Sequence, residues 1–499
     1  MGMIKEENIR LIFGLKLKQL RMDQGISQQM LSRKTGISVS YLNEIEKGKK
    51  YPKPDKVATL ADGLGVEYDQ LTSLKLGRNL APISDLLQSN ILSELPLDMF
   101  NIEANKLLEV LSSDEPNKFS AFVNTIIAVC RSYDIKLETF FFSVLRSFQE
   151  MYENYFPELE TAADAFRKEY GLTQDPDDRR RILDSCLRDK FGYHIEYGGL
   201  DAHPDLQDLR SLVIPDEKSP RLLLNSSLTP RQIIFTLGRE VGYSYLQLTE
   251  RPYTASWVNV TSFEQVLNNF KASYFANALL MPEKPFIQAL KGIFMEKAFD
   301  ANRLVDLMES SGATPEMFMY RLTNLLPKHL GISDLFFFRF SSDWEVDRIE
   351  LTKELHLSHL HLPHGTFLNE HYCRRWASVQ ALHEAKQLTE ANEKTRPICL
   401  VQRSYYSENK SEFLILTLAR PQSTVASTLT SVTIGLNLNE TLKRKVRFWN
   451  DPGIPTQFVS TTCERCAIHD CDQRVARPVI LQEEQRLETM QLVLQDLLK

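Results

Sequence analysis

The sequence has few cysteines and no long apolar run, and both shortages narrow what the protein can be. Seven of its 499 residues are cysteine, and no secretory signal precedes them, so a disulfide framework is not expected. No uninterrupted apolar stretch reaches the roughly 18 residues that a transmembrane helix needs. The opening "MGMIKEENIRLIFGLKLKQL" carries charge throughout and lacks the apolar core of a signal peptide. These absences predict a cytoplasmic protein with reduced thiols.

Length and charge then indicate several domains, one of which is basic. Single hydrophobic cores rarely grow beyond about 250 residues, so a chain of this length is expected to form more than one. Residues 10–56 hold 11 Lys or Arg against 4 Asp or Glu, whereas the whole chain has a formal net charge of −6. Clustered positive charge favours nucleic acid as a partner, because phosphate contacts release counterions.

The basic segment has the pattern of a helix-turn-helix. Apolar residues recur at helical spacing over residues 9–22. Ser27 is suited to cap a second helix, Gly36 permits a tight turn after it, and Ser38 is suited to cap a third. The stretches "SQQML", "GIS" and "YLNEIE" resemble the phage-repressor or XRE family of DNA-binding domains, and the resemblance covers roughly residues 9–75. It implies a DNA-binding head over residues 1–78.

The resemblance assigns DNA contacts to the second and third helices. The start of the second helix approaches phosphates in this family, and the exposed face of the third reaches base edges in the major groove. Helix capping or solvation is the alternative role for each side chain, above all for Ser38. A homodimer on a double-stranded DNA operator is expected, because one such domain reads only a few base pairs. The predicted DNA-binding residues are Gln28, Gln29, Ser38, Ser40, Tyr41, Asn43, Lys47, Lys49 and Lys50.

The middle of the chain is predicted to be helical and then mixed. Residues 79–160 hold repeated amphipathic runs, which indicate a helical linker that also helps dimerisation. Residues 161–330 combine short strands with helices. The strand "RLLLN", the helix "PRQIIFTLGREVGYSY" and the later "ASYFANALLMP" resemble the IrrE or ImmA family of zinc metallopeptidase-like domains. In that family the first of these helices carries the zinc-binding pattern His-Glu-x-x-His.

The zinc ligands of that family are missing from this sequence. Arg239, Glu240 and Tyr243 stand at the His-Glu-x-x-His positions, and Asn269 stands at the position of the later acidic ligand. Neither Arg nor Tyr replaces a neutral imidazole on zinc, and Glu240 has no metal-bound water to activate. We therefore expect a degenerate α+β metallopeptidase-like domain, no catalytic residues and no enzyme activity. A zinc peptidase that cleaves a repressor is the enzyme alternative.

Residues 331–499 are predicted to form a C-terminal α/β GAF-like sensor domain. Stretches such as "DLFFFRFS", "PICLVQRSYY" and "EFLILTLARPQ" have the composition and alternation of strands, which indicates an antiparallel sheet with a few covering helices. Arg339, Arg403 and Arg420 are candidate contacts for an anionic ligand, or else exposed strand residues.

Three of the seven cysteines lie close together in "CERCAIHDC", residues 463–471, with C-x2-C-x4-C spacing. A short irregular loop can direct several thiolates at one metal centre, and cysteine's preference for burial argues against chance clustering in a polar segment. Thiolate softness allows zinc, with His469 as a further ligand, or an iron-sulfur cluster. The spacing leaves both open.

The order of these parts resembles the short-chain fatty acyl regulators, in which a cysteine loop followed by a stretch like "DQRVARP" closes the chain. The resemblance implies a role in fatty acid metabolism, a short-chain acyl-CoA as effector, and a [4Fe-4S] cluster. A further family element, a cysteine followed closely by Arg-Trp, is matched by "CRRW" at Cys373. A cubane cluster takes four thiolates when the protein supplies every ligand. The predicted ligands are Cys373, Cys463, Cys466 and Cys471.

The sequence thus predicts a multidomain protein with an all-α helix-turn-helix head, which acts as a ligand-responsive transcriptional regulator. The alternative is a phage or mobile-element repressor that protein partners control, with a structural zinc ion in the cysteine loop. Iron and sulfide content would separate the two.

Overall fold

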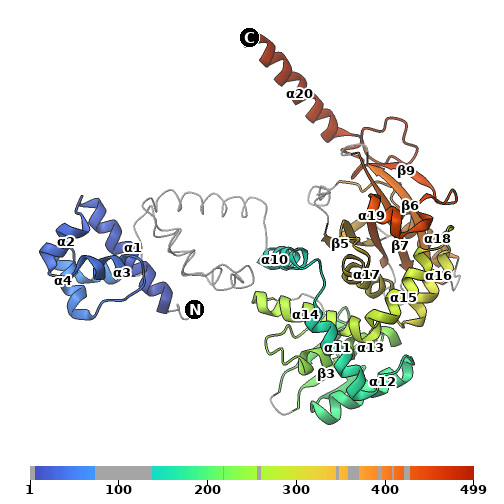
Figure 1. The fold of residues 1–499 in the computed structure, drawn as a ribbon, viewed down its shortest axis with the longest axis horizontal. Coiled ribbons are helices and arrows are strands. Elements are labelled where there is room, and N and C mark those ends of the chain that lie inside the picture. The colour runs from blue at the N-terminus through green and yellow to red at the C-terminus, as the bar shows by residue number, and fades with distance from the viewer. Residues whose placement is uncertain are drawn as a thin grey trace. The chain divides into compact units, whose positions relative to one another are not determined.

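The computed structural model describes residues 6–73, 137–216, 219–254, 260–343, 348–357, 370–391, 396–406, 410–420 and 428–498 (Figure 1). The chain divides into two compact units, residues 1–144 with 260–264, and residues 145–259 with 265–499. Most of the helical linker predicted over residues 79–160 lies outside the described residues, which resume at residue 137. None of the described helices is long and apolar enough to cross a membrane.

The first unit contains the head, and its helices begin and end at the residues that the local sequence favours. Ser27 accepts a hydrogen bond from the Met30 N–H at 3.1 Å, and Gly36 adopts the left-handed conformation at φ 69°. Ser38 accepts from the Tyr41 N–H at 3.3 Å. These contacts confirm the predicted helix-turn-helix. The helices are α1 (Glu6–Asp23), α2 (Gln28–Thr35), α3 (Val39–Glu46), α4 (Pro54–Leu64) and α5 (Tyr68–Thr72).

The head has a hydrophobic core of its own, in which Leu17, Leu31, Leu42 and Leu60 are all buried. Gly14 lets α1 approach α3 closely, because a Cβ atom at this position would lie only 2.3 Å from the Ile45 carbonyl oxygen. The core therefore fixes one side of α3 against α1. The opposite side of α3 faces solvent.

The second unit starts with helices and a small mixed sheet. Strands β1 (His194–Tyr197), β3 (Arg221–Leu224) and β2 (Ser211–Ile214) lie in that order, with β1 parallel and β2 antiparallel to β3. The surrounding helices are α10 (Leu137–Met151), α11 (Pro157–Tyr170), α12 (Pro176–Ser185), the π-helix Cys186–Lys190, α13 (Pro230–Tyr245), α14 (Phe263–Leu280), α15 (Glu283–Phe294), α16 (Ala301–Ser310) and α17 (Pro315–Leu330).

A buried ion pair joins α11 to α17 inside this unit. Arg321 donates to both carboxylate oxygens of Glu160, at 2.5 and 2.8 Å, and its side chain is fully buried. Tyr274 of α14 donates to the same carboxylate at 2.7 Å. The charge of Glu160 is therefore balanced and its oxygens are hydrogen-bonded, as a buried carboxylate requires.

A six-stranded sheet forms the C-terminal part, in the order β5-β4-β8-β7-β6-β9. Neighbouring strands are antiparallel except β6 and β9, which are parallel. The strands are β4 (Leu335–Asp343), β5 (Arg348–His356), β6 (Ile398–Tyr406), β7 (Ser411–Arg420), β8 (Thr428–Asn437) and β9 (Thr456–Val459).

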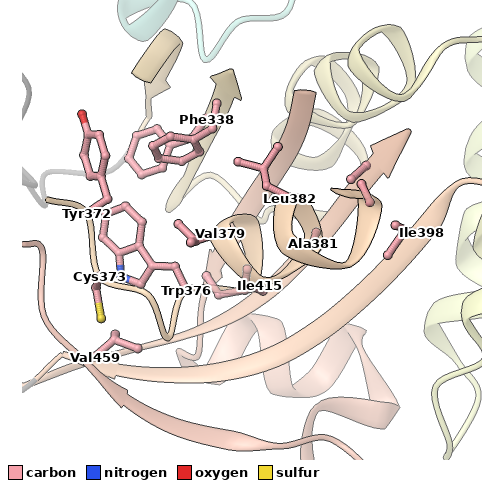
Figure 2. Close-up of a cluster of buried hydrophobic side chains, with 14 of the residues drawn as sticks. Phe338, Tyr372, Cys373, Trp376, Val379, Ala381, Leu382, Ile398, Ile415 and Val459 are labelled. Atoms are coloured by element: carbon pink, nitrogen blue, oxygen red, sulfur yellow. The ribbon is translucent and has the colours of Figure 1, made fainter. Parts of the chain in front are cut away.

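Helices cover both faces of this sheet, and β4 shows how its residues divide between them. Phe336, Phe338 and Phe340 belong to the hydrophobic cluster under α18 (Ala377–Glu390), part of which Figure 2 shows. Phe337 points to the other face, where its ring lies 5.5 Å from that of Tyr320 in α17. Alternate side chains of a strand face opposite sides, so the sheet lies between α18 and α17.

The chain ends with α19 (Glu440–Lys445), the 3-10 helix Arg447–Asn450, strand β9, the cysteine loop and α20 (Val479–Leu497). The final helix begins directly after Pro478.

Candidate functional site

The predicted phosphate-contacting residues at the start of α2 differ in their surroundings. The Gln28 side-chain amide donates to the buried carboxylate of Glu46 at 2.7 Å. Arg21 donates to the same carboxylate at 2.6 and 3.0 Å. Gln28 thus braces α2 against the end of α3, whereas Gln29 is exposed.

The predicted base-contacting face of α3 is largely open. The Ser38 hydroxyl caps α3, which is the alternative to DNA contact that the sequence left open for this residue. Lys50 pairs with Glu44 at 2.9 Å and lies 5.8 Å from the centre of the Tyr41 ring. The exposed predicted residues are Ser38, Ser40, Lys47, Lys49 and Lys50, and the half-buried ones are Tyr41 and Asn43.

An ion-pair network fills the peptidase-like site on α13. Glu240 is fully buried, and Arg251 donates to one of its carboxylate oxygens. The other oxygen lies 3.4 Å from the guanidinium of Arg239, which also donates to the Ser211 hydroxyl at 3.2 Å. Both carboxylate oxygens of Glu240 therefore contact an arginine.

The other two residues singled out in the sequence, Tyr243 and Asn269, contact each other. The Tyr243 hydroxyl donates to the Asn269 side-chain oxygen at 3.0 Å, and the Arg251 guanidinium lies 3.9 Å from the centre of the Tyr243 ring. Burial raises the pKa of Tyr243, so its phenol stays neutral. The structure thus brings together the four positions chosen from the sequence and adds Arg251, which the sequence did not indicate.

Cys373 and the cysteine loop lie side by side in the C-terminal part. Tyr372 and Thr462 form an antiparallel bridge. The Cys373 N–H donates to the Thr461 carbonyl at 3.1 Å, and the Cys463 N–H donates to the His371 carbonyl at 2.9 Å. The two segments are 90 positions apart in the sequence, yet they pair like strands.

Carboxylates reinforce this pairing. Glu370 accepts two hydrogen bonds from Arg465, at 2.9 and 2.8 Å, and one from Thr462 at 2.6 Å. Within the loop, Arg474 donates to the carbonyls of Cys463 at 3.0 Å and Cys466 at 3.2 Å. One guanidinium therefore binds two backbone carbonyls of the loop.

Three of the four predicted cluster ligands are buried in this region. Cys373, Cys463 and Cys466 are each 6% exposed. Burial raises the pKa of the Cys373 thiol to about 11, and the nearby Cys466 and Cys463 act in the same direction. Cys471 is half-buried in the same loop. Within the described residues, no three His, Cys, Asp or Glu side chains stand in an arrangement that could hold a metal ion.

The surroundings of Cys373 suit a sulfur-rich anionic group. The backbone of Ser460 and Arg375 acts to lower the pKa of the Cys373 thiol, although burial outweighs it. The Trp376 indole N–H and the Ser460 hydroxyl are buried and have no hydrogen-bond partner in the described structure. Figure 2 shows the indole nitrogen on the side of the ring toward Cys373. Since buried donors are rarely left unpaired, these groups fit acceptor atoms bound beside Cys373.

The three arginines considered for an anionic ligand all have partners within the chain. Arg339 donates to the Thr352 hydroxyl at 2.8 Å, Arg403 donates to the Ile454 carbonyl at 3.1 Å, and Arg420 lies 3.7 Å from Glu309. A small cavity of about 10 Å³ lies instead between α18 and the sheet. Its lining includes Phe336, Phe338, Trp376, Ser404, Tyr406 and Ile415.

The fold and these sites define a helix-turn-helix protein with an altered peptidase-like domain, and comparisons with known proteins agree. Residues 17–71 match the helix-turn-helix family, and residues 194–323 match the IrrE N-terminal-like domain. The chain belongs to the helix-turn-helix transcriptional regulators. It is 35% identical over 60 residues to the uncharacterised HTH-type transcriptional regulator YazB of Bacillus subtilis, a match that covers 12% of this chain and 87% of that protein. It is 33% identical over 65 residues to the control protein C.BamHI of Bacillus amyloliquefaciens, covering 13% and 80%.

A longer match extends into the body of the chain. Over 333 residues the sequence is 22% identical to the propionyl-CoA carboxylase regulator of Cereibacter sphaeroides, which covers 63% of this chain and 65% of that protein. The chain thus spans slightly less than two thirds of that relative's length. A solved structure of a Mycobacterium tuberculosis transcriptional regulator aligns with 67% of this chain and 93% of that one, at a TM-score of 0.46 and 19% identity.

Proposed function

We propose that the chain is a DNA-binding transcriptional regulator that responds to a short-chain acyl-CoA and carries an iron-sulfur cluster. The observation that carries the proposal is the helix-turn-helix head, in which Ser40 on α3 and Lys47, Lys49 and Lys50 directly after it are exposed. The regulator of propionyl-CoA carboxylase among its relatives supports an acyl-CoA effector.

In this proposal α3 enters the major groove of an operator, and a homodimer reads two half-sites. Gln28 acts mainly by fixing α2 through Glu46, because its amide is already bonded there. Gln29 is free to approach phosphate from an exposed position. Lys50 would exchange Glu44 for a phosphate on binding.

The DNA-binding proposal predicts a change in salt dependence. We expect Lys49→Ala with Lys50→Ala to reduce the slope of log affinity against log salt by about 2, since each phosphate contact contributes about 0.9. Binding titrations of the full chain on one duplex, at several salt concentrations, measure this slope. As a control, Lys56→Ala changes an exposed lysine of α4 and should leave it nearly unchanged. An unchanged slope in the double variant would contradict the assignment of these lysines to phosphate.

The sensor part of the proposal places the acyl group in a GAF-like domain. The antiparallel sheet with helices on both faces supports such a domain. The cavity under α18 has a volume of only about 10 Å³, so an acyl group could enter there only by displacing side chains of its lining. Trp376 lines this cavity and follows Cys373 by three positions. A ligand that displaces Trp376 would therefore also act on the cysteine region, which offers a physical link between the two.

Cys373, Cys463, Cys466 and Cys471 would hold the cluster, which would supply a centre sensitive to oxidation. Three of these thiols are buried together, and the fourth would have to turn inward from its half-buried position. The unpaired Trp376 indole N–H would donate to a cluster sulfur. A structural zinc ion held by protein thiolates remains the alternative, and metal analysis decides between them.

The proposal assigns no enzyme activity to the middle domain. Its support is the occupation of Glu240 by Arg239 and Arg251, which leaves that carboxylate no capacity to activate water.

A further inference from the structure

No apolar side chain of the last helix is buried in the described structure. None of the residues of α20 is buried, and residues 482–498 are all exposed. Figure 1 shows the helix projecting beyond the six-stranded sheet. Helices in water gain most of their stability from packing an apolar face rather than from propensity. A 19-residue helix with exposed apolar side chains is therefore expected to pack against another protein surface.

Four apolar residues of α20 follow a heptad, whereas the exposed Leu492 and Val493 lie outside its a and d positions. Leu487, Met490, Leu494 and Leu497 are 49%, 51%, 54% and 77% exposed, and their spacing is three, four and three residues. This is the a and d pattern of a coiled coil, in which the partner is another helix with the same repeat. These four residues form a short apolar seam of less than two heptads. A partner helix must therefore present an apolar seam of the same length.

Charge indicates how two copies of this helix would pair. The first half of the helix holds Glu483, Glu484 and Glu488 with one cation, Arg486, so it keeps a net negative charge, and the second half has one charged residue, Asp496. A parallel pair would bring the acidic halves together, and like charges at neighbouring positions are destabilising. An antiparallel pair places each acidic half beside the weakly charged half of the other copy.

We propose that α20 pairs antiparallel with α20 of a second copy of this chain. Leu487 then faces Leu497 of the partner subunit, and Met490 faces Leu494 of the partner subunit. The pairing depends on neither the cluster nor the acyl-CoA of the proposed function, and it supplies a dimer contact outside the DNA-binding head.

The start of α20 links this contact to the cysteine loop. The N–H groups of Ile480 and Leu481 donate to the Glu464 carbonyl at 3.1 and 3.2 Å. Arg465 lies 4.0 Å from Glu484 on the second turn. The loop therefore sets the direction in which α20 leaves the domain, and a change in the loop would redirect the dimer contact.

The first test measures self-association of the full chain by sedimentation over a range of concentrations. Leu487→Glu with Leu494→Glu places charge at two seam positions, and we expect the dissociation constant to rise at least about 100-fold. The matched control, Gln482→Glu with Gln495→Glu, adds the same charge at outer positions of the helix and should remain a dimer. Because all four residues are half-exposed or fully exposed, neither pair should unfold the protein. A monomeric wild type, or equal dissociation constants for the two double variants, would overturn the proposal.

The second test measures orientation by disulfide formation in a redox buffer, with the wild type as background for the native cysteines. An equal mixture of Met490→Cys and Leu494→Cys chains should form a covalent dimer that contains one chain of each kind, because these positions face each other only in the antiparallel pair. Each variant alone should not cross-link above background. Self-linked dimers of the Met490→Cys chain would show a parallel pair and contradict the proposal.

Discussion

Cys373→Ser is expected to remove the iron-sulfur cluster from anaerobically purified protein. The cysteine loop supplies three thiols, and a [4Fe-4S] cluster with protein ligands alone takes four. Cys373 lies outside the loop but is held beside it, because its N–H donates to Thr461 and the Cys463 N–H donates to His371. We expect iron and sulfide to fall to a small fraction of the wild-type content, with loss of the visible absorption band.

Cys399→Ser and Cys186→Ser are the matched controls. Burial raises the pKa of the Cys399 thiol to about 12 and that of Cys186 to about 11, as in neutral core thiols. Both variants should keep the wild-type ratio of iron to protein. A full cluster in Cys373→Ser would show that the fourth ligand is another residue. One zinc ion and no sulfide in the wild type would support the repressor with a structural zinc site.

Glu240→Ala is expected to destabilise the protein by about 3–5 kcal/mol, the usual cost of removing one partner from a buried ion pair. The side chain is fully buried between Arg239 and Arg251, so its loss leaves two guanidinium groups without their counter-charge. The change should appear as a lower urea midpoint, compared with Glu158→Ala, which removes an exposed carboxylate from α11.

A double variant separates lost charge pairing from lost packing. Arg251→Met removes one of the two unpaired cations, so Glu240→Ala with Arg251→Met should be more stable than the sum of the single variants implies. Additive effects would contradict the ion-pair explanation. Stoichiometric zinc in the wild type that disappears in Glu240→Ala would refute the degenerate-peptidase interpretation.

The helix-turn-helix was predictable because its signals are local. Ser27, Gly36 and Ser38 act on backbone groups within three or four positions of themselves, and the structure confirms each cap and the left-handed turn. The role of Gln28 was not predictable in this way. Its partner Glu46 lies 18 positions away, and only the packing of α2 on α3 brings them together.

The middle domain shows the same division. The absence of zinc ligands could be seen directly in the sequence, since Arg239 and Tyr243 have the wrong chemistry. Arg251 could not be found, because it lies beyond the end of α13 and reaches Glu240 only through the fold of the following turn. A buried carboxylate without a metal does imply a cation, and that requirement is the one signal that sequence reasoning could have used.

The cysteine region was predicted in part. The pairing of Cys373 with the loop agrees with its choice as the fourth ligand, which stays a prediction, and the structure leaves Cys471 half-buried. The unpaired Trp376 N–H depends on side-chain placement and has no sequence signal. For α20, only the structure shows that its apolar side chains are left exposed within the described chain.

The most direct test measures DNA affinity of the anaerobically purified full chain with and without an acyl-CoA. The duplex is one selected by the protein from a random pool, and salt is held constant because it dominates affinity. If the chain is a ligand-responsive regulator, acetyl-CoA, propionyl-CoA or a longer thioester should change the affinity by a factor of about 5–150, the usual range of coupling between sites. Free coenzyme A should have a much smaller effect. Tight DNA binding that none of the thioesters alters would contradict the account.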